Sequence, residues 1–307
     1  MKMGIVTVFI TRKCSHKCPH CMVWRFRRSE RPPEFWAEQM KYTWSTEGEG
    51  VHFVMLGGEP LEYGGLVDLV RMLGRRNYSF TSNSVSLTRE LAERLVSYGL
   101  PNWSVSIDLP EELGDDRDRA GFRAIRLMRE LGVPDIHVTI TVYPWSVKYL
   151  RKLFRELKAL GVYIEVTVAT WAKASWYDFA PPTPVKFTEE HKREIQGAVL
   201  EELGSYPRWH GVPEMFTEDL DVILRNEYRC KKPQVVVDED GYMRLCREVP
   251  GKRVRKYTLV SALERWGDFT RDWYADREEM CLGCNWACAY MEDRHYNFTH
   301  LKEFGGW

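Results

Sequence analysis

Three cysteines near the start of the chain have the spacing of a metal-binding loop. Cys14, Cys18 and Cys21 follow the pattern Cys-x3-Cys-x2-Cys. Thiolates hold iron–sulfur clusters, and a [4Fe–4S] cluster normally takes four of them. Three ligands leave one iron with an open position, which a metal needs in order to bind a substrate. The pattern therefore predicts a catalytic metal site, and a zinc site that includes His16 or His20 is the alternative.

A second group of cysteines lies in the last third of the chain. Its members are Cys230, Cys246, Cys281, Cys284 and Cys288, and no cysteine occurs in the 208 residues that separate the two groups. This clustering favours metal sites over a disulfide framework. Five cysteines suffice for one fully ligated cluster but not for two. A four-cysteine zinc site is the alternative.

The overall composition excludes several classes of function. Lys and Arg together number 44, as do Asp and Glu, so no net field draws the chain to nucleic acid or to an anionic membrane. Residues 3–10 are too short for a signal peptide, and no run approaches the roughly 20 apolar residues that span a bilayer. We expect a soluble, cytoplasmic protein without nucleic acid or membrane partners.

The elements that must position the first cysteines alternate regularly along the chain. Strands are predicted over 4–11, 51–56, 78–82, 103–107, 136–142 and 162–168. Helices are predicted over 34–44, 64–76, 88–99, 119–132 and 146–160, with Thr88 as an N-cap. This alternation predicts an α/β fold, a partial (β/α)6 TIM-like barrel. Reactive groups in such barrels lie on loops at the C-terminal ends of the strands, where the first cysteines and Gly57-Gly58-Glu59-Pro60 are expected.

The alternating pattern ends in a proline-rich stretch at residues 181–184. We therefore expect the barrel to occupy residues 1–185. A helix is predicted over 188–203, within a helical linker at 186–229. Residues 230–307 are expected to form a smaller α+β auxiliary-cluster domain, in which Asp238-Glu239-Asp240-Gly241 joins the two strands of a β-hairpin.

The cysteine spacing, its place after the first strand and Gly57-Gly58-Glu59-Pro60 after the second resemble the radical S-adenosylmethionine (SAM) superfamily. The resemblance covers nearly the whole chain and implies an enzyme. In this family the amino and carboxylate groups of SAM chelate the open iron, and one electron from the cluster cleaves a carbon–sulfur bond. The 5′-deoxyadenosyl radical then takes a hydrogen atom from a substrate. The cofactor supplies the difficult chemistry, and the protein orients it.

Several segments resemble the cofactor contacts of this family. Gly57-Gly58-Glu59-Pro60 is similar to the segment that receives the methionyl ammonium, although an ordinary strand-to-helix turn is the alternative. Thr81-Ser82-Asn83 resembles the family's Thr-x-Asn-Gly, with Ser84 in place of the glycine. Ser106 and Asp108, at the end of the fourth strand, resemble its Ser-Leu-Asp-Gly and are implied to contact the ribose.

Two further segments extend the resemblance. Arg117-Asp118-Arg119 and Gly121-Phe122 resemble the family's Arg-Gly and Gly-Phe elements, so Arg119 or Arg117 is implied to meet the cofactor carboxylate. A solvated helix start is the alternative. Val168-Ala169-Thr170 ends the sixth strand, where the family's backbone contacts adenine.

The second cysteine group resembles the SPASM and twitch extensions found behind many barrels of this family. Cys230, Cys246, Cys281 and Cys284 match a twitch arrangement, and Cys288 could replace one of them, as a late cysteine does in the SPASM form. The resemblance implies an auxiliary [4Fe–4S] cluster, and therefore two clusters in the chain.

The resemblance implies a radical SAM oxidoreductase or maturase that oxidises or crosslinks a peptide, a protein or a small molecule. A strand that starts at residue 4 leaves no room for an N-terminal leader-peptide-binding domain, which argues against a self-sufficient peptide maturase, although such a domain can be a separate chain. The arginines at positions 25, 27, 28 and 31 could dock a reductant such as flavodoxin or ferredoxin. The alternatives are a non-catalytic iron–sulfur electron carrier or scaffold, which has no use for an open iron, and a zinc-stapled binding module.

Overall fold

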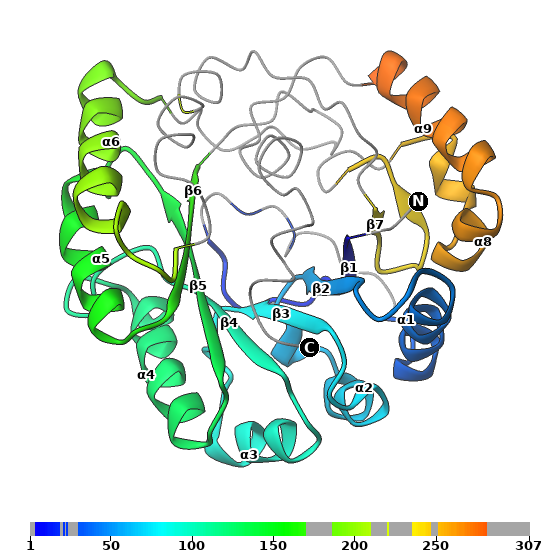
Figure 1. Ribbon diagram of the computed structural model, residues 1–307, viewed down its shortest axis with the longest axis horizontal. Helices are drawn as coiled ribbons and strands as arrows, with labels where there is room; N and C mark the ends of the chain where they lie inside the picture. The colour runs from blue at the N-terminus through cyan, green and yellow to red at the C-terminus, as the bar shows by residue number, and fades with distance from the viewer. Residues whose placement is uncertain are drawn as a thin grey trace.

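The computed structural model describes residues 4–18, 21, 23, 30–169, 186–209, 220, 235–246 and 251–280. Six parallel strands form most of one sheet: β1 (Ile5–Thr11), β2 (His52–Gly57), β3 (Tyr78–Ser82), β4 (Asn102–Ser106), β5 (Asp135–Val142) and β6 (Tyr163–Val168). The strand order is β6-β5-β4-β3-β2-β1-β7-β8, and the sheet is not closed. The α/β fold expected from the sequence is confirmed, in the form of an open barrel (Figure 1).

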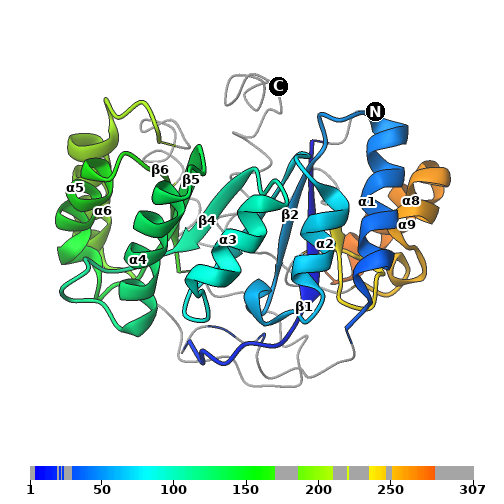
Figure 2. The ribbon, with the colours of Figure 1, turned by 90° about the horizontal axis from the view of Figure 1, so that it is seen from below.

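Helices alternate with these strands and cover the convex side of the sheet (Figure 2). They are α1 (Pro33–Glu47), α2 (Leu66–Leu73), α3 (Arg89–Ser97), α4 (Asp116–Glu130) and α5 (Leu150–Ala159). Thr88 caps α3 as expected, because its side chain accepts a hydrogen bond from the Leu91 amide. The predicted helix over 119–132 starts earlier, since Asp115 and Asp118 form a capping box at residue 115.

The two faces of the sheet differ in polarity, as β5 and β6 illustrate. Ile136, Val138, Ile140 and Val142 alternate along β5 and are buried in the apolar core. Because successive side chains of a strand point to opposite faces, the intervening residues lie on the concave side. Those of β5 and its neighbour β6 are His137, Thr139, Thr141, Tyr163, Glu165 and Thr167. The concave side here is polar, whereas barrel interiors are commonly filled by branched apolar side chains.

The later part of the chain packs around the barrel at both ends of the sheet. Helix α6 (Glu189–Leu203) lies against α5, and α8 (Leu259–Glu264), which precedes α9 (Trp266–Met280), contacts α1. Strand β7 (Val236–Val237) pairs in parallel with β1 and in antiparallel with β8 (Met243–Arg244). The expected hairpin is confirmed, and it extends the barrel sheet beyond β1 (Figure 1). Within the described ranges, no helix is both long and apolar enough to cross a bilayer.

Candidate active site

The three cysteines of the first group lie on the loop that leaves β1. Cys14, Cys18 and Cys21 are partly buried, and none of the described cysteines forms a disulfide. The Cys14 thiol donates to the carbonyl of His16 at 3.2 Å, and the Cys21 amide donates to the carbonyl of Cys18 at 3.1 Å. These two hydrogen bonds to backbone carbonyls hold the loop that carries the three cysteines.

Burial disfavours the thiolate form of two of these cysteines. The pKa of Cys14 is raised to about 12, mainly by burial and also by the charges of Cys21 and Glu59, although the hydrogen bond to the His16 carbonyl lowers it. Burial also raises the pKa of Cys18, and the positive charge of Arg117 opposes that shift. A metal ion deprotonates a coordinating thiol, so these raised pKa values do not rule out metal binding by the loop.

The glycines of Gly57-Gly58-Glu59-Pro60 let β2 approach the cysteine loop closely. A Cβ on Gly57 would lie 2.0 Å from the Thr11 carbonyl oxygen, and one on Gly58 would lie 2.0 Å from that of Lys13. The Gly58 and Glu59 amides donate to these same carbonyls at 2.8 and 2.7 Å. These two hydrogen bonds join the segment after β2 to the start of the cysteine loop, and we call them the backbone zipper.

The buried carboxylate of Glu59 joins the ends of β2 and β3. It accepts hydrogen bonds from the Ser82 hydroxyl at 2.6 Å, the Asn83 amide at 2.7 Å and the Leu61 amide at 3.0 Å. Burial raises the pKa of Glu59, and these hydrogen bonds oppose the shift. Glu59 thus fixes the positions of two strand ends next to the cysteine loop.

The predicted cofactor segment after β3 also reaches the cysteine loop. Asn83 donates from Nδ2 toward the sulfur of Cys14 at 3.9 Å, and Thr81 donates to the Ser104 hydroxyl at 3.3 Å. Ser84 has a φ of 58°, a left-handed conformation that non-glycine residues rarely adopt. Ser84 stands where the similar family motif has glycine, and it adopts a backbone conformation that is typical of glycine.

A buried ionic cluster lies between β4, α4 and the cysteine loop. Asp108 accepts from Arg117 Nη2 at 2.5 Å and from the Thr141 amide at 2.8 Å. Asp118 accepts from the Asp108 amide at 2.7 Å. Arg117 also donates from Nη1 toward the sulfur of Cys18 at 3.8 Å. The carboxylate predicted to contact a ribose therefore binds an arginine that contacts the cysteine loop.

The structure brings Arg117, and not Arg119, to the cysteines. The Arg119 side chain is 49% exposed and lies 3.6 Å from Asp116 on the outer surface of α4. Ser106 is half-buried at the end of β4. Cys246 is partly buried and follows β8. Five predicted site residues lie outside the described ranges: Thr170, Cys230, Cys281, Cys284 and Cys288.

Tyr143 is a site residue that the sequence reasoning missed. It directly follows β5 at the C-terminal edge of the sheet, and its ring stacks on Trp145 at 5.3 Å between centroids. Burial raises the pKa of Tyr143, and the negative charge of Asp108 raises it further while Arg117 lowers it. An aromatic residue immediately after a strand of this barrel was the available signal.

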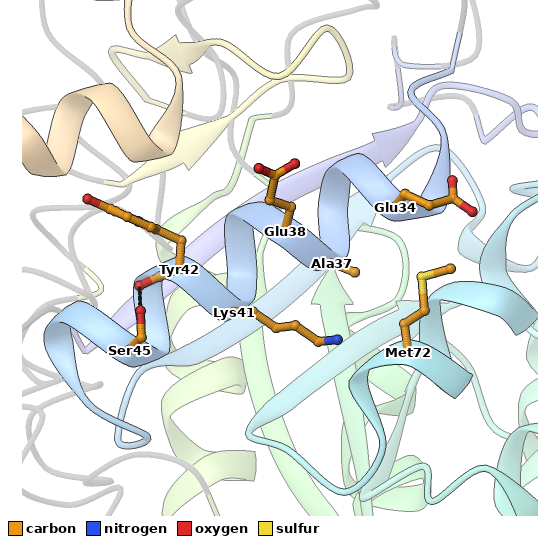
Figure 3. A pocket seen from close by; sticks show the side chains of 7 residues that line it. All are labelled: Glu34, Ala37, Glu38, Lys41, Tyr42, Ser45 and Met72. Atoms are coloured by element: carbon orange, nitrogen blue, oxygen red, sulfur yellow. Dashed lines mark hydrogen bonds between the residues drawn. The ribbon is translucent and has the colours of Figure 1, made fainter.

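An open pocket elsewhere on the surface holds none of the predicted site residues. It lies between the outward faces of α1 and α2, and Figure 3 shows Glu34, Glu38 and Lys41 along α1 with Met72 opposite them. These residues lie on the helices that cover the convex side. The candidate active site is therefore the cluster of strand ends around the cysteine loop.

Comparisons with known proteins place this arrangement among characterised families. The family model of the Radical SAM superfamily matches residues 8–172, which is more than half of the chain. The "AdoMet-dependent heme synthase" of Nitratidesulfovibrio vulgaris is 26% identical over 183 residues. That match covers 55% of this chain and 49% of the relative, so the chain spans about half the length of that curated protein.

Two solved structures share the fold at low sequence identity. Native anSMEcpe with bound AdoMet and Cp18Cys peptide has a TM-score of 0.62 at 15% identity, and the match covers 99% of each chain. SuiB of Streptococcus suis bound to the precursor peptide SuiA has a TM-score of 0.65 at 13% identity, over 92% of this chain and 70% of SuiB. In a further structure, of SuiB bound to S-adenosylmethionine, the match covers 60% of the SuiB chain.

Proposed function

This chain belongs to the radical SAM superfamily, and we propose that Cys14, Cys18 and Cys21 hold a [4Fe–4S] cluster whose open iron binds SAM. The cysteine loop is the observation that supports this proposal most directly. Its three thiols lie on the loop that leaves β1, beside the backbone zipper of Gly57–Glu59. A cubane cluster attaches each thiolate to a separate iron, so three thiolates would leave one iron of four open to SAM.

The proposed SAM site uses the ends of β2, β3 and β4. Gly57–Pro60 would receive the methionyl ammonium, with Glu59 holding the segment rigid through Ser82 and Asn83. Thr81 and Ser106, the half-buried hydroxyls at the strand ends, would contact the nucleoside, and Asp108 would orient Arg117. Thr170 keeps its proposed contact with the adenine, whereas Arg119 lies on the exposed side of α4 and is not proposed to contact SAM. When bound, the cluster and SAM supply the reductive cleavage that starts radical chemistry on a substrate.

A peptide or protein is the proposed substrate. The concave side of β5 and β6 presents His137, Thr139 and Glu165, and Thr139 donates to Glu165 at 3.3 Å. Hydroxyl, imidazole and carboxylate groups suit a substrate rich in hydrogen-bonding groups, as a peptide is. Peptide-bound anSMEcpe and SuiB share this fold, which supports the proposal. The similarity to a heme synthase favours a small molecule as the second candidate.

An auxiliary [4Fe–4S] cluster is proposed for the chain beyond residue 230. Cys246 would be one ligand, and three of Cys230, Cys281, Cys284 and Cys288 would be the others. This cluster would accept an electron from the substrate radical, which gives a net oxidation or a crosslink. Residues 1–185 would form the barrel domain, 186–229 a linker and 230–307 the auxiliary domain, in a cytoplasmic enzyme reduced by flavodoxin or ferredoxin.

Anaerobic reconstitution with iron and sulfide tests the proposal. After reduction with dithionite in the presence of SAM, 5′-deoxyadenosine is expected by chromatography, and the electron paramagnetic resonance (EPR) signal is expected to change when SAM is added. Replacing Cys14, Cys18 and Cys21 with Ala should remove about four irons and abolish both results. Full iron content in that triple variant would refute the assignment. Eight irons without either change would favour the electron-carrier alternative.

A further inference from the structure

The contact between Arg117 and Cys18 links a fixed positive charge to a proposed cluster ligand. Arg117 Nη1 lies 3.8 Å from the Cys18 sulfur, within hydrogen-bonding reach of a sulfur acceptor. Arg117 is the second residue of α4, and the capping box at Asp115 fixes that end of the helix. The arginine therefore reaches the cysteine loop from a rigid element.

Buried carboxylates prevent the guanidinium from turning away. Arg117 Nη2 lies 2.5 Å from Asp108 and 3.5 Å from Asp118, and all three residues are more than nine-tenths buried. Asp108 is itself fixed by the Thr141 amide of β5. Because its partners are held by backbone groups of two elements, the guanidinium keeps one orientation with Nη1 toward the sulfur.

The guanidinium has a donor left over after these contacts. Arg117 Nε is buried and makes no hydrogen bond within the described part of the structure. A buried donor that lacks a partner costs free energy. The hydrogen bonds of Arg117 to Asp108 and Asp118 therefore do not satisfy all of its buried donors.

We infer that Arg117 is a positioning residue that donates a charged hydrogen bond to the Cys18 sulfur and makes the cluster easier to reduce. The inference rests on the function proposed above. When the cluster takes one electron from its reductant, its charge becomes more negative by one. A cation held at a ligand sulfur stabilises that reduced form, and hydrogen bonds to the sulfurs and net charge are known to set cluster potentials. Arg117 therefore raises the midpoint potential.

Redox titration of the reconstituted full chain tests this inference. The midpoint potential is followed by EPR, using only the signal component that changes when SAM is added, so the auxiliary cluster does not interfere. Arg117→Met removes the charge and should shift the potential to a more negative value. Arg119→Met is the matched control, because its side chain lies on the exposed side of the same helix, and it should leave the potential unchanged.

A second variant should shift the midpoint potential in the opposite direction. Asp108→Asn removes the main counter-charge of Arg117 and should shift the potential to a more positive value. Opposite shifts from the two halves of one ion pair are not expected if the pair only supports the fold. If Arg117→Met fails to bind iron, Asp108→Asn alone decides, and an unchanged or more negative potential overturns the inference.

The result also separates this inference from the proposed function. A SAM-sensitive signal in the natural sequence, with equal potentials in all variants, overturns the role of Arg117 and leaves the proposed function standing. Absence of any SAM-sensitive signal in the natural sequence overturns both.

Discussion

Arg12 Nε lies 2.6 Å from Glu239 Oε2, and both side chains are almost fully buried. Arg12 follows β1 and leads into the cysteine loop, whereas Glu239 lies in the turn between β7 and β8. Arg31 adds a second link, since its Nε donates to the Asp240 carbonyl at 2.9 Å. The cysteine loop and the hairpin that precedes Cys246 are therefore held together by charge.

Breaking this buried pair should destabilise the protein. Glu239→Gln is expected to lower the free energy of unfolding by about 3 kcal/mol, because removing one partner leaves the other charge buried. Urea denaturation of the reconstituted chain measures the loss. The double variant Arg12→Met/Glu239→Leu should recover much of it, since apolar pairs replace buried ion pairs well. A loss no larger than that of Glu130→Gln, in an exposed pair with Arg89, would contradict the prediction.

Adding a side chain to the backbone zipper should disrupt the metal site. Gly57→Ala places a Cβ 2.0 Å from a carbonyl oxygen at a φ of 123° and is expected to cost about 3 kcal/mol. The displaced loop should also bind less iron on reconstitution. Gly267→Ala is the control, because a Cβ there meets nothing within 4 Å and Ala favours the helix. Equal stability and iron content in the two variants would argue against the zipper.

His52 should make the stability fall with acidification. Its ring contacts Asn77 at 2.5 Å and Ser79 at 2.8 Å, and burial lowers its pKa while the Asn77 hydrogen bond opposes this. Because the folded pKa of His52 is below the unfolded value of about 6.5, the contribution of His52 to stability is fully present above pH 6.5. Below it, the unfolded state binds a proton that the folded state does not, and stability declines by at most about 1.4 kcal/mol per pH unit.

Urea denaturation between pH 7.5 and 5 measures this slope. His52→Gln should be less stable at neutral pH but should lose less stability on acidification than the natural sequence. The difference between the two proteins isolates His52 from the carboxylates that titrate in the same range. A difference that stays constant with pH would show that His52 does not carry the slope.

The iron content should identify the fourth ligand of the auxiliary cluster. Of Cys284→Ala and Cys288→Ala, we expect the variant that removes a ligand to lose about four irons per chain, and the other to keep all of them. Cys246→Ala should lose the same four irons, because its place after the hairpin suits it as a ligand. Retention of all iron in all three variants would count against an auxiliary cluster.

The sequence predicted the fold better than the site. The six strands are recognisable because apolar and β-branched residues alternate along them, and all six lie within one residue of their expected limits. The site depends on helix phase, which shifts with a single residue. The sequence leaves Arg119 and Arg117 as alternatives, with the helix predicted from 119, whereas the capping box starts α4 at Asp116 and Arg117 is the one buried beside the cysteine loop. The roles of Asp108 and Glu59 depend on long-range contacts that no local pattern reveals.

Strand β1 pairs with β2 on one side and with β7 on the other, and Thr7 lies beside Val236. The second pairing joins residues that are more than two hundred positions apart, so during synthesis it can form only after most of the chain has left the ribosome. Until then β1 is a sheet edge, and Arg12 awaits its counter-charge on Glu239. A nascent chain thus gains its complete support for the cysteine loop only late in its synthesis.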